Sequence, residues 1–118
     1  MDTKEALEQT VKNTADDIER MAAGTYQIED PETYETIEEE FIESYTLDEN
    51  YIIDSRGNMR GAWMYTTLGG PTVWIDTMRG TVRGTWGFDS FEWGLSAKAQ
   101  DWVQEQAEEM YDTLNANY

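Results

Sequence analysis

The stretch that decides the fold runs from residue 50 to residue 87 and reads NYIIDSRGNMRGAWMYTTLGGPTVWIDTMRGTVRGTWG. β-Branched and aromatic residues are common in it and alternate with polar residues, a period of two that is typical of half-buried strands. Three glycine-containing dipeptides interrupt the alternation, at residues 57–58, 69–70 and 79–80. Such dipeptides favour two-residue hairpin turns. The sequence therefore predicts a four-stranded antiparallel meander with strands at residues 50–56, 59–67, 72–78 and 81–87.

The three predicted turns agree on the side chains that share one face of this sheet. Two-residue loops place Ile53 opposite Ala62, and Thr77 opposite Val82. The apolar face then collects Tyr51, Ile53, Ala62, Met64, Val73, Ile75, Val82 and Trp86. A slip of one residue would move a strand's apolar set to the other face, so the agreement among independent turns supports the meander.

The opposite face of the predicted sheet carries large aromatic side chains among polar ones. Trp63, Tyr65 and Trp74 lie on it, and Asp76 is expected directly opposite Arg83 as a cross-strand ion pair. Aromatic rings beside arginines can stack nucleic-acid bases, but the net charge of −17 opposes this, and two other interpretations fit the mixture. The face is either a second small core beneath the N-terminal helix or an exposed surface for protein recognition.

Helical periodicity is expected on both sides of the strands. Before them, residues 3–23 place apolar side chains at three- and four-residue steps, and Gly24 is a suitable stop. Residues 88–95 are predicted to form a loop or a short fifth strand. Ser96 can then cap a last helix that extends to about residue 114. The apolar side of that helix carries Ala99, Val103, Gln106, Met110 and Leu114.

The most acidic stretch of the chain is predicted to be one more helix, over residues 31–46, with Asp30 as its N-cap. Its acidic ridge would consist of Glu32, Glu35, Glu39 and Glu43. The last helix repeats this design with Asp101, Glu105, Glu108 and Asp112 opposite its apolar side. We therefore expect a single α+β domain over residues 1–118, in the order α-α-β-β-β-β-α.

The net charge of −17 restricts the partners that the chain can bind. Residues 1–50 hold 16 acids and three bases, residues 51–95 hold four of each, and residues 96–118 hold five acids and one lysine. Repulsion opposes direct binding to nucleic acid or to an anionic membrane, and favours basic protein partners. No apolar run approaches the roughly 18 residues of a membrane span, and the polar N-terminus is not a signal peptide. A cytoplasmic location is therefore expected.

Residue patterns for catalysis or metal binding are not found. The chain has no His and no Cys, so it has neither the Ser-His or Cys-His pairs of nucleophilic catalysis nor thiolate ligands. Four central acids could supply a glycosidase pair, but turn capping and ion pairing account for them: Asp54, Asp76, Asp89 and Glu92. The run at residues 38–40 would point in three directions around a helix, and residues 48–50 lack the spacing of a calcium loop. We expect no enzymatic activity, no cofactor and no metal.

A small, acidic, cysteine-free chain with acid-faced helices around an antiparallel sheet resembles the anti-CRISPR and antirestriction DNA mimics of phages and mobile elements. The resemblance is compositional and covers the two acidic helices. It implies a non-catalytic inhibitor that occupies a Lys/Arg-rich, nucleic-acid-binding site of a host-defence nucleoprotein complex. The carboxylates implied are those of Glu32, Glu35, Glu39, Glu43, Asp101, Glu105, Glu108 and Asp112.

Trp63 and Trp74 are candidate anchors in the same interface, because tryptophan is enriched among residues that dominate binding energy. Two alternatives remain open. The acidic helix faces can be plain solvated surfaces of a protein-binding or structural module. They can also reflect salt adaptation in a halophilic proteome, although the uneven distribution of the acids counts against this.

Overall fold

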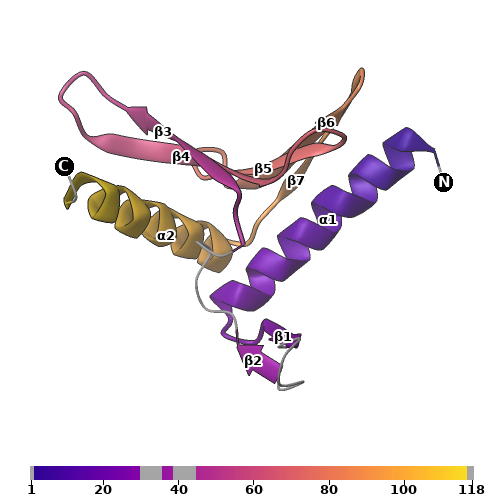
Figure 1. The fold of residues 1–118 in the computed structure, drawn as a ribbon, viewed down its shortest axis with the longest axis horizontal. Helices are drawn as coiled ribbons and strands as arrows, with labels where there is room; N and C mark the ends of the chain where they lie inside the picture. The colour runs from indigo at the N-terminus through magenta and orange to yellow at the C-terminus, as the bar shows by residue number, and fades with distance from the viewer. Residues whose placement is uncertain (1, 30–35, 39–44, 117–118) are drawn as a thin grey trace.

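The computed structural model describes residues 2–29, 36–38 and 45–116. Among these residues, two 20-residue helices flank seven strands (Figure 1). The elements are α1 (Thr3–Ala22), β1 (Gln27–Glu29), β2 (Thr36–Glu38), β3 (Asp48–Ile53), β4 (Met59–Thr67), β5 (Thr72–Asp76), β6 (Thr81–Trp86), β7 (Asp89–Gly94) and α2 (Ala97–Ala116). Strands β3 to β7 form one antiparallel sheet in sequence order, and β1 pairs with β2 separately.

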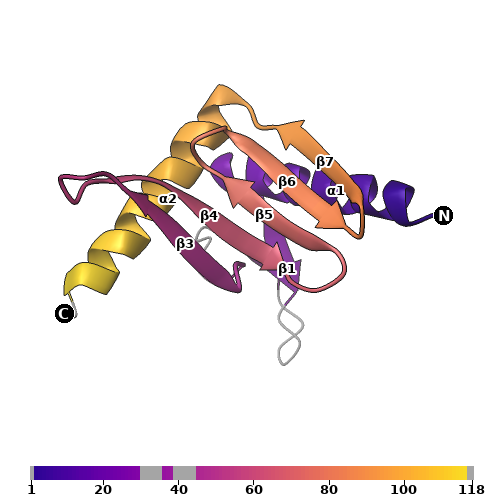
Figure 2. The same ribbon diagram turned by 90° about the horizontal axis from the view of Figure 1, so that it is seen from above.

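Both helices lie on the same side of the five-stranded sheet (Figure 1). We call the face of the sheet that they cover the inner face, and the opposite one the outer face. Seen from above, the strands lie in front of both helices, and no described helix covers the outer face (Figure 2). The domain therefore has two layers, with its hydrophobic core between the inner face and the helices.

The core is built from residues that the sequence assigns to it. Helix α1 buries Leu7, Val11 and Ile18, whereas α2 buries mainly small residues around Val103. From the sheet come Ala62, Met64, Val73, Ile75 and Val82, all fully buried. Gly84 allows α1 to approach β6 closely, because a Cβ there would lie only 2.8 Å from the Val11 side chain and 2.9 Å from Leu7.

The predictions for the first and last helices are confirmed, including the Ser96 cap, and Asp2 caps the first helix. The Asp2 carboxylate accepts a hydrogen bond from the backbone N–H of Glu5 at 2.8 Å. The Ser96 hydroxyl accepts one from the N–H of Ala99 at 3.1 Å. Both contacts satisfy an N–H group that the first turn of a helix leaves unpaired.

The predicted helix over residues 31–46 is wrong. Thr36–Glu38 is strand β2, which pairs antiparallel with β1 so that Ile37 lies opposite Ile28. Glutamates four residues apart repel one another in a helix, and the β-branched pair at residues 36–37 is well suited to a strand once a partner strand is present. Residues 31–35 and 39–44 lie outside the described residues, and with them the whole predicted ridge of Glu32, Glu35, Glu39 and Glu43.

The prediction of a four-stranded meander is also wrong, because residues 89–94 form a fifth strand. Strand β7 pairs with β6 without a register shift, from Thr81 opposite Gly94 to Trp86 opposite Asp89. Gly87, at φ +62°, supports the tight turn between the two strands. The alternation of Phe91 and Trp93 with polar residues is the strand signal in this segment.

All three predicted turns are longer than two residues, and at the first and the third the strand register differs as well. Tyr51 lies opposite Ala62, where Ile53 was expected, and Ile75 lies opposite Val82, where Thr77 was expected. Carboxylates hold these longer turns: Asp54 accepts bonds from the N–H groups of residues 56 and 58, and Asp76 from that of residue 79. Each of these two registers is displaced by two residues, which leaves the side chains on their predicted faces up to the register shift at Ile53, a residue that is 42% exposed.

Candidate partner-binding surfaces

The outer face carries an aromatic cluster, which we define as Trp63, Tyr65 and Trp74. Tyr65 on β4 and Arg83 on β6 are the direct cross-strand neighbours of Trp74 on β5. The ring centroids of Trp63 and Tyr65 lie 5.7 and 5.9 Å from that of Trp74, and the Arg83 guanidinium lies 5.4 Å from it. These are the separations of attractive aromatic and cation–π contacts.

Trp74 supports the cluster and presents little surface of its own. Only 8% of the residue is exposed, and its indole Nε1 has no hydrogen-bond partner among the described residues. Trp63 and Tyr65 are half-buried. A partner on this face would therefore touch Trp63 and Tyr65, with Trp74 holding both rings in place.

The charged side chains on the Arg83 side of the cluster pair with one another, whereas Asp48, opposite Tyr65, forms no ion pair among the described residues. Glu92 on β7 receives two hydrogen bonds from the Arg79 guanidinium, at 2.5 and 2.8 Å, and one from the Thr81 hydroxyl at 2.8 Å. These contacts lower the pKa of Glu92 to about 2. Asp76, 3% exposed, lies 3.4 Å from Arg83, whose Nε is also 3.5 Å from Glu92.

The predicted ion pair between Asp76 and Arg83 is thus present, although the two residues are diagonal rather than directly opposite. Two carboxylates with two arginines leave this part of the outer face without net charge. Both carboxylates, Asp76 and Glu92, are paired with arginines. Their contacts therefore do not favour a role in acid–base catalysis on the outer face.

The second candidate surface is the solvent side of α2. It carries the carboxylate row, which we define as Asp101, Glu105, Glu108 and Asp112, all exposed. Glu108 accepts a hydrogen bond from the Gln104 amide at 3.2 Å. No described base forms an ion pair with any member of the row. The buried residues Ala99, Val103 and Ala107 fix this helix to the sheet on its other side.

The end of the carboxylate row borders a hollow at the β3–β4 turn. The hollow has a volume of roughly 410 Å³ and is lined by Gly57, Asn58, Met59, Glu108, Tyr111 and Asp112. This size is in the range of small-molecule sites. Two carboxylates and a phenol ring together suit a cationic side chain, because the ring face attracts cations as well.

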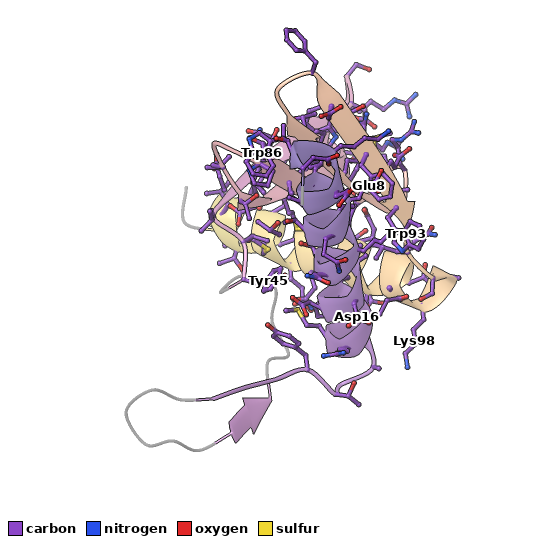
Figure 3. All side chains as sticks on the ribbon, turned by 90° about the vertical axis from the view of Figure 1, so that its right-hand side faces the viewer. Glu8, Asp16, Tyr45, Trp86, Trp93 and Lys98 are labelled. Carbon is purple, nitrogen blue, oxygen red and sulfur yellow. The ribbon has the colours of Figure 1, made fainter. Side chains whose placement is uncertain are left out.

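Helix α1 also carries five acids, but the described contacts engage three of them. Asp16 pairs with Arg20 at 2.8 Å. Asp17 accepts a bond from the Tyr45 hydroxyl at 2.8 Å. Glu19 accepts one from the Ser96 hydroxyl at 2.5 Å, at the start of α2. Figure 3 shows Tyr45 to one side of α1 and Trp93 to the other.

The structure therefore separates the residues predicted to share one interface. The carboxylate row lies on the helical side of the domain, and Trp63 and Trp74 lie on the outer face, with the sheet between them (Figure 1). The described residues contain no group of three or more potential metal ligands. Neither α1 nor α2 has the length and apolar character needed to cross a membrane.

Comparisons of the chain with protein-family models, curated proteins and solved structures find no match.

Proposed function

We propose that the domain is a non-catalytic inhibitor that uses the carboxylate row of α2 to occupy a basic, nucleic-acid-binding site on a partner protein. The observation that carries this proposal is the absence of any ion pair to the row within residues 2–29, 36–38 and 45–116. Acids that repel one another along a helix cost stability. A basic partner would offset that cost.

The charge density of the row supports mimicry of a nucleic-acid strand. Asp101 and Asp112 are 11 residues apart, which is about 16–17 Å along a helix. Five carboxylates, counting Glu109, fall in this span, or one per about 4 Å. A DNA strand carries one phosphate per about 3.4 Å of axis. Lys/Arg side chains that fit a phosphate strand can therefore meet a similar series of charges on α2.

The hollow beside Glu108 and Asp112 adds a specific contact. A lysine or arginine of the partner can enter it, pair with both carboxylates and lie against the Tyr111 ring. Rigid placement matters here, because a preorganised surface loses less conformational entropy on binding. Helix packing on the sheet supplies this rigidity.

The narrower form of the proposal names the partner as a nucleoprotein complex of a host-defence system, in the cytoplasm. It rests on the resemblance of the chain to phage and mobile-element inhibitors. Salt adaptation is the competing explanation of the acidity, and it requires no partner.

The test compares two variants with equal changes of charge. Glu105→Lys/Glu108→Lys reverses two acids of the row, and Asp16→Lys/Asp48→Lys reverses two acids outside it. Immobilised domain is incubated with extracts of cells that contain CRISPR or restriction systems, and captured nucleases are assayed for binding of labelled duplex DNA. Wild-type domain and control variant should displace the DNA. The row variant loses two charge contacts, so the concentration of domain that displaces half of the DNA should rise at least about tenfold.

Displacement should weaken as salt rises from 50 to 200 mM, as counterion release requires. Equal displacement by both variants would show that the row does not recognise the partner. Capture of no nucleic-acid-binding protein at either salt concentration would contradict the inhibitor function. Unfolding of the domain at low salt, seen by circular dichroism, would instead favour salt adaptation.

A further inference from the structure

The two edge strands of the large sheet differ in how they are protected. Strand β3 has a register shift between Ile52 and Ile53, and such irregularities hinder the pairing of an exposed edge. Strand β7 pairs with β6 in an unbroken register, and no described residue pairs with its other edge. Residues 89–94 contain no proline and no lysine, and of their two acids Glu92 is held by arginines, which leaves Asp89 as the one unpaired charge on this edge among the described residues.

Apolar side chains line the inner side of this edge as well. Phe91 and Trp93 project on the inner face of β7, with ring centroids 6.0 Å apart and an interplanar angle of 19°. Trp93 remains 46% exposed. The Lys12 ammonium of α1 lies 4.8 Å from the Trp93 centroid, beside the open edge. Figure 3 shows Trp93 beside α1 rather than beneath it.

Electrostatics also favour this edge for self-association. Two chains of net charge −17 repel each other, so they can meet only where the local charge is balanced. On β7, Glu92 is held by Arg79 and by Arg83. Asp89 lies on the inner face, opposite Trp86.

We propose that β7 pairs antiparallel with β7 of a second copy of this chain, which joins two five-stranded sheets into one of ten strands. With Phe91 on the two-fold axis, Ser90 lies opposite Glu92 of the second copy, and Asp89 lies opposite its Trp93. Direct neighbours share a face, so each Asp89 approaches the Lys12 that covers Trp93 of the other copy. These two symmetric charge contacts favour a second copy over an unrelated extended peptide.

Cysteine cross-linking tests the pairing and its register, because the chain has no cysteine of its own. Phe91→Cys places two thiols across the axis, where opposed Cα atoms lie about 4.5–5.5 Å apart, within disulfide range. Ser90→Cys is the matched control, since its two Cα atoms would be separated by about 8 Å, beyond that range. Circular dichroism checks that both variants fold.

Mild oxidation should convert most of Phe91→Cys to a disulfide-linked dimer and leave Ser90→Cys monomeric. Equal cross-linking of the two variants, or none in folded Phe91→Cys, would overturn the proposed pairing.

A charge swap tests the contact between Lys12 and Asp89 by sedimentation equilibrium in 0.5 M NaCl. Asp89→Lys should raise the dimer dissociation constant about tenfold, because two symmetric charge contacts are lost. This weakening is expected even though the variant is less negative and its two copies repel each other less. The double variant Lys12→Asp/Asp89→Lys should restore the wild-type dissociation constant.

Wild-type dimerisation should strengthen between 0.05 and 0.5 M NaCl, because salt screens the repulsion between the acidic chains. A wild-type mass that stays monomeric at millimolar concentration in 0.5 M NaCl would overturn the proposal. So would an Asp89→Lys variant that dimerises as tightly as wild type.

Discussion

Helices α1 and α2 are equally long, cover the same face of the sheet and carry five acids each, yet their acids have different surroundings. On α1, three acids bond to Arg20, Tyr45 and Ser96, and the helix also carries three bases. On α2, the carboxylate row has no described base, and Lys98 is the one base of the helix. Acidity alone therefore does not identify a binding surface. An acid that bonds to residues of its own domain contributes to the fold, whereas an acid without a described base is a candidate for contact with a partner.

The largest effect should come from removing the buried anchors of the two helices. Ile18→Ala on α1 empties a fully buried site and should lower the free energy of unfolding by about 2–5 kcal/mol. Val103→Ala on α2 removes fewer buried methyl groups and should cost about 2 kcal/mol. Urea denaturation followed by circular dichroism measures both. A larger loss for Val103→Ala would contradict the expectation that the cost follows the number of buried methyl groups removed.

A smaller effect is expected from Tyr45→Phe, which removes the bond to Asp17 of α1. The loss at neutral pH should be about 1 kcal/mol, the net contribution of a typical hydrogen bond. Burial and then the bond to Asp17 raise the pKa of Tyr45 above its ordinary value.

The pH dependence of that contact follows from the raised pKa. Only the unfolded chain ionises Tyr45 readily above pH 10, so the stabilisation is complete below that pH and is lost as the pH rises further. The stability of wild type relative to Tyr45→Phe should therefore fall between pH 10 and 12. Parallel stability curves for the two proteins over this range would show that Tyr45 does not titrate differently on folding.

The smallest effect, and one of opposite sign, is expected on α2. Glu105→Gln removes repulsion with Asp101 and Glu109, each four residues away, and should stabilise the domain by a few tenths of a kcal/mol. The matched change on α1, Glu19→Gln, should destabilise the domain, because the Glu19 carboxylate accepts a hydrogen bond from Ser96, the residue that precedes α2. Thermal unfolding at low salt measures both. A loss of stability in Glu105→Gln would mean that the row contributes to the fold.

The sequence predicts the elements whose signals are local. Both long helices have capping residues and an apolar side of the right period, and the carboxylate row lies on the solvent side of α2 as expected. The inner face of the sheet is also correct, since register errors of two residues do not exchange faces. Turn lengths were not predictable from glycine alone, because the carboxylates of Asp54 and Asp76 extend two of the turns.

The remaining differences depend on partners distant in sequence. Strand β2 exists where it pairs with β1, a contact that helical periodicity in residues 31–46 cannot reveal. The choice of inner face depends on Gly84, which lets Leu7 and Val11 approach the sheet, whereas Trp74 occupies the other side. This difference between a small residue on the inner face and a large one on the outer face can be recognised in the sequence only once the strand register is known. It explains why Trp63 and Trp74 lie away from the carboxylate row.

The position of the sheet between the carboxylate row and the balanced outer face gives the described part of the molecule an electric dipole moment. Its more negative end lies on the side of α2, and its less negative end on the outer side of the sheet, where Arg79 and Arg83 pair with acids. A positively charged surface exerts a torque on such a dipole before any contact is made. The charges of the described residues would therefore turn α2 toward a basic partner, and more collisions would be productive than in random orientations.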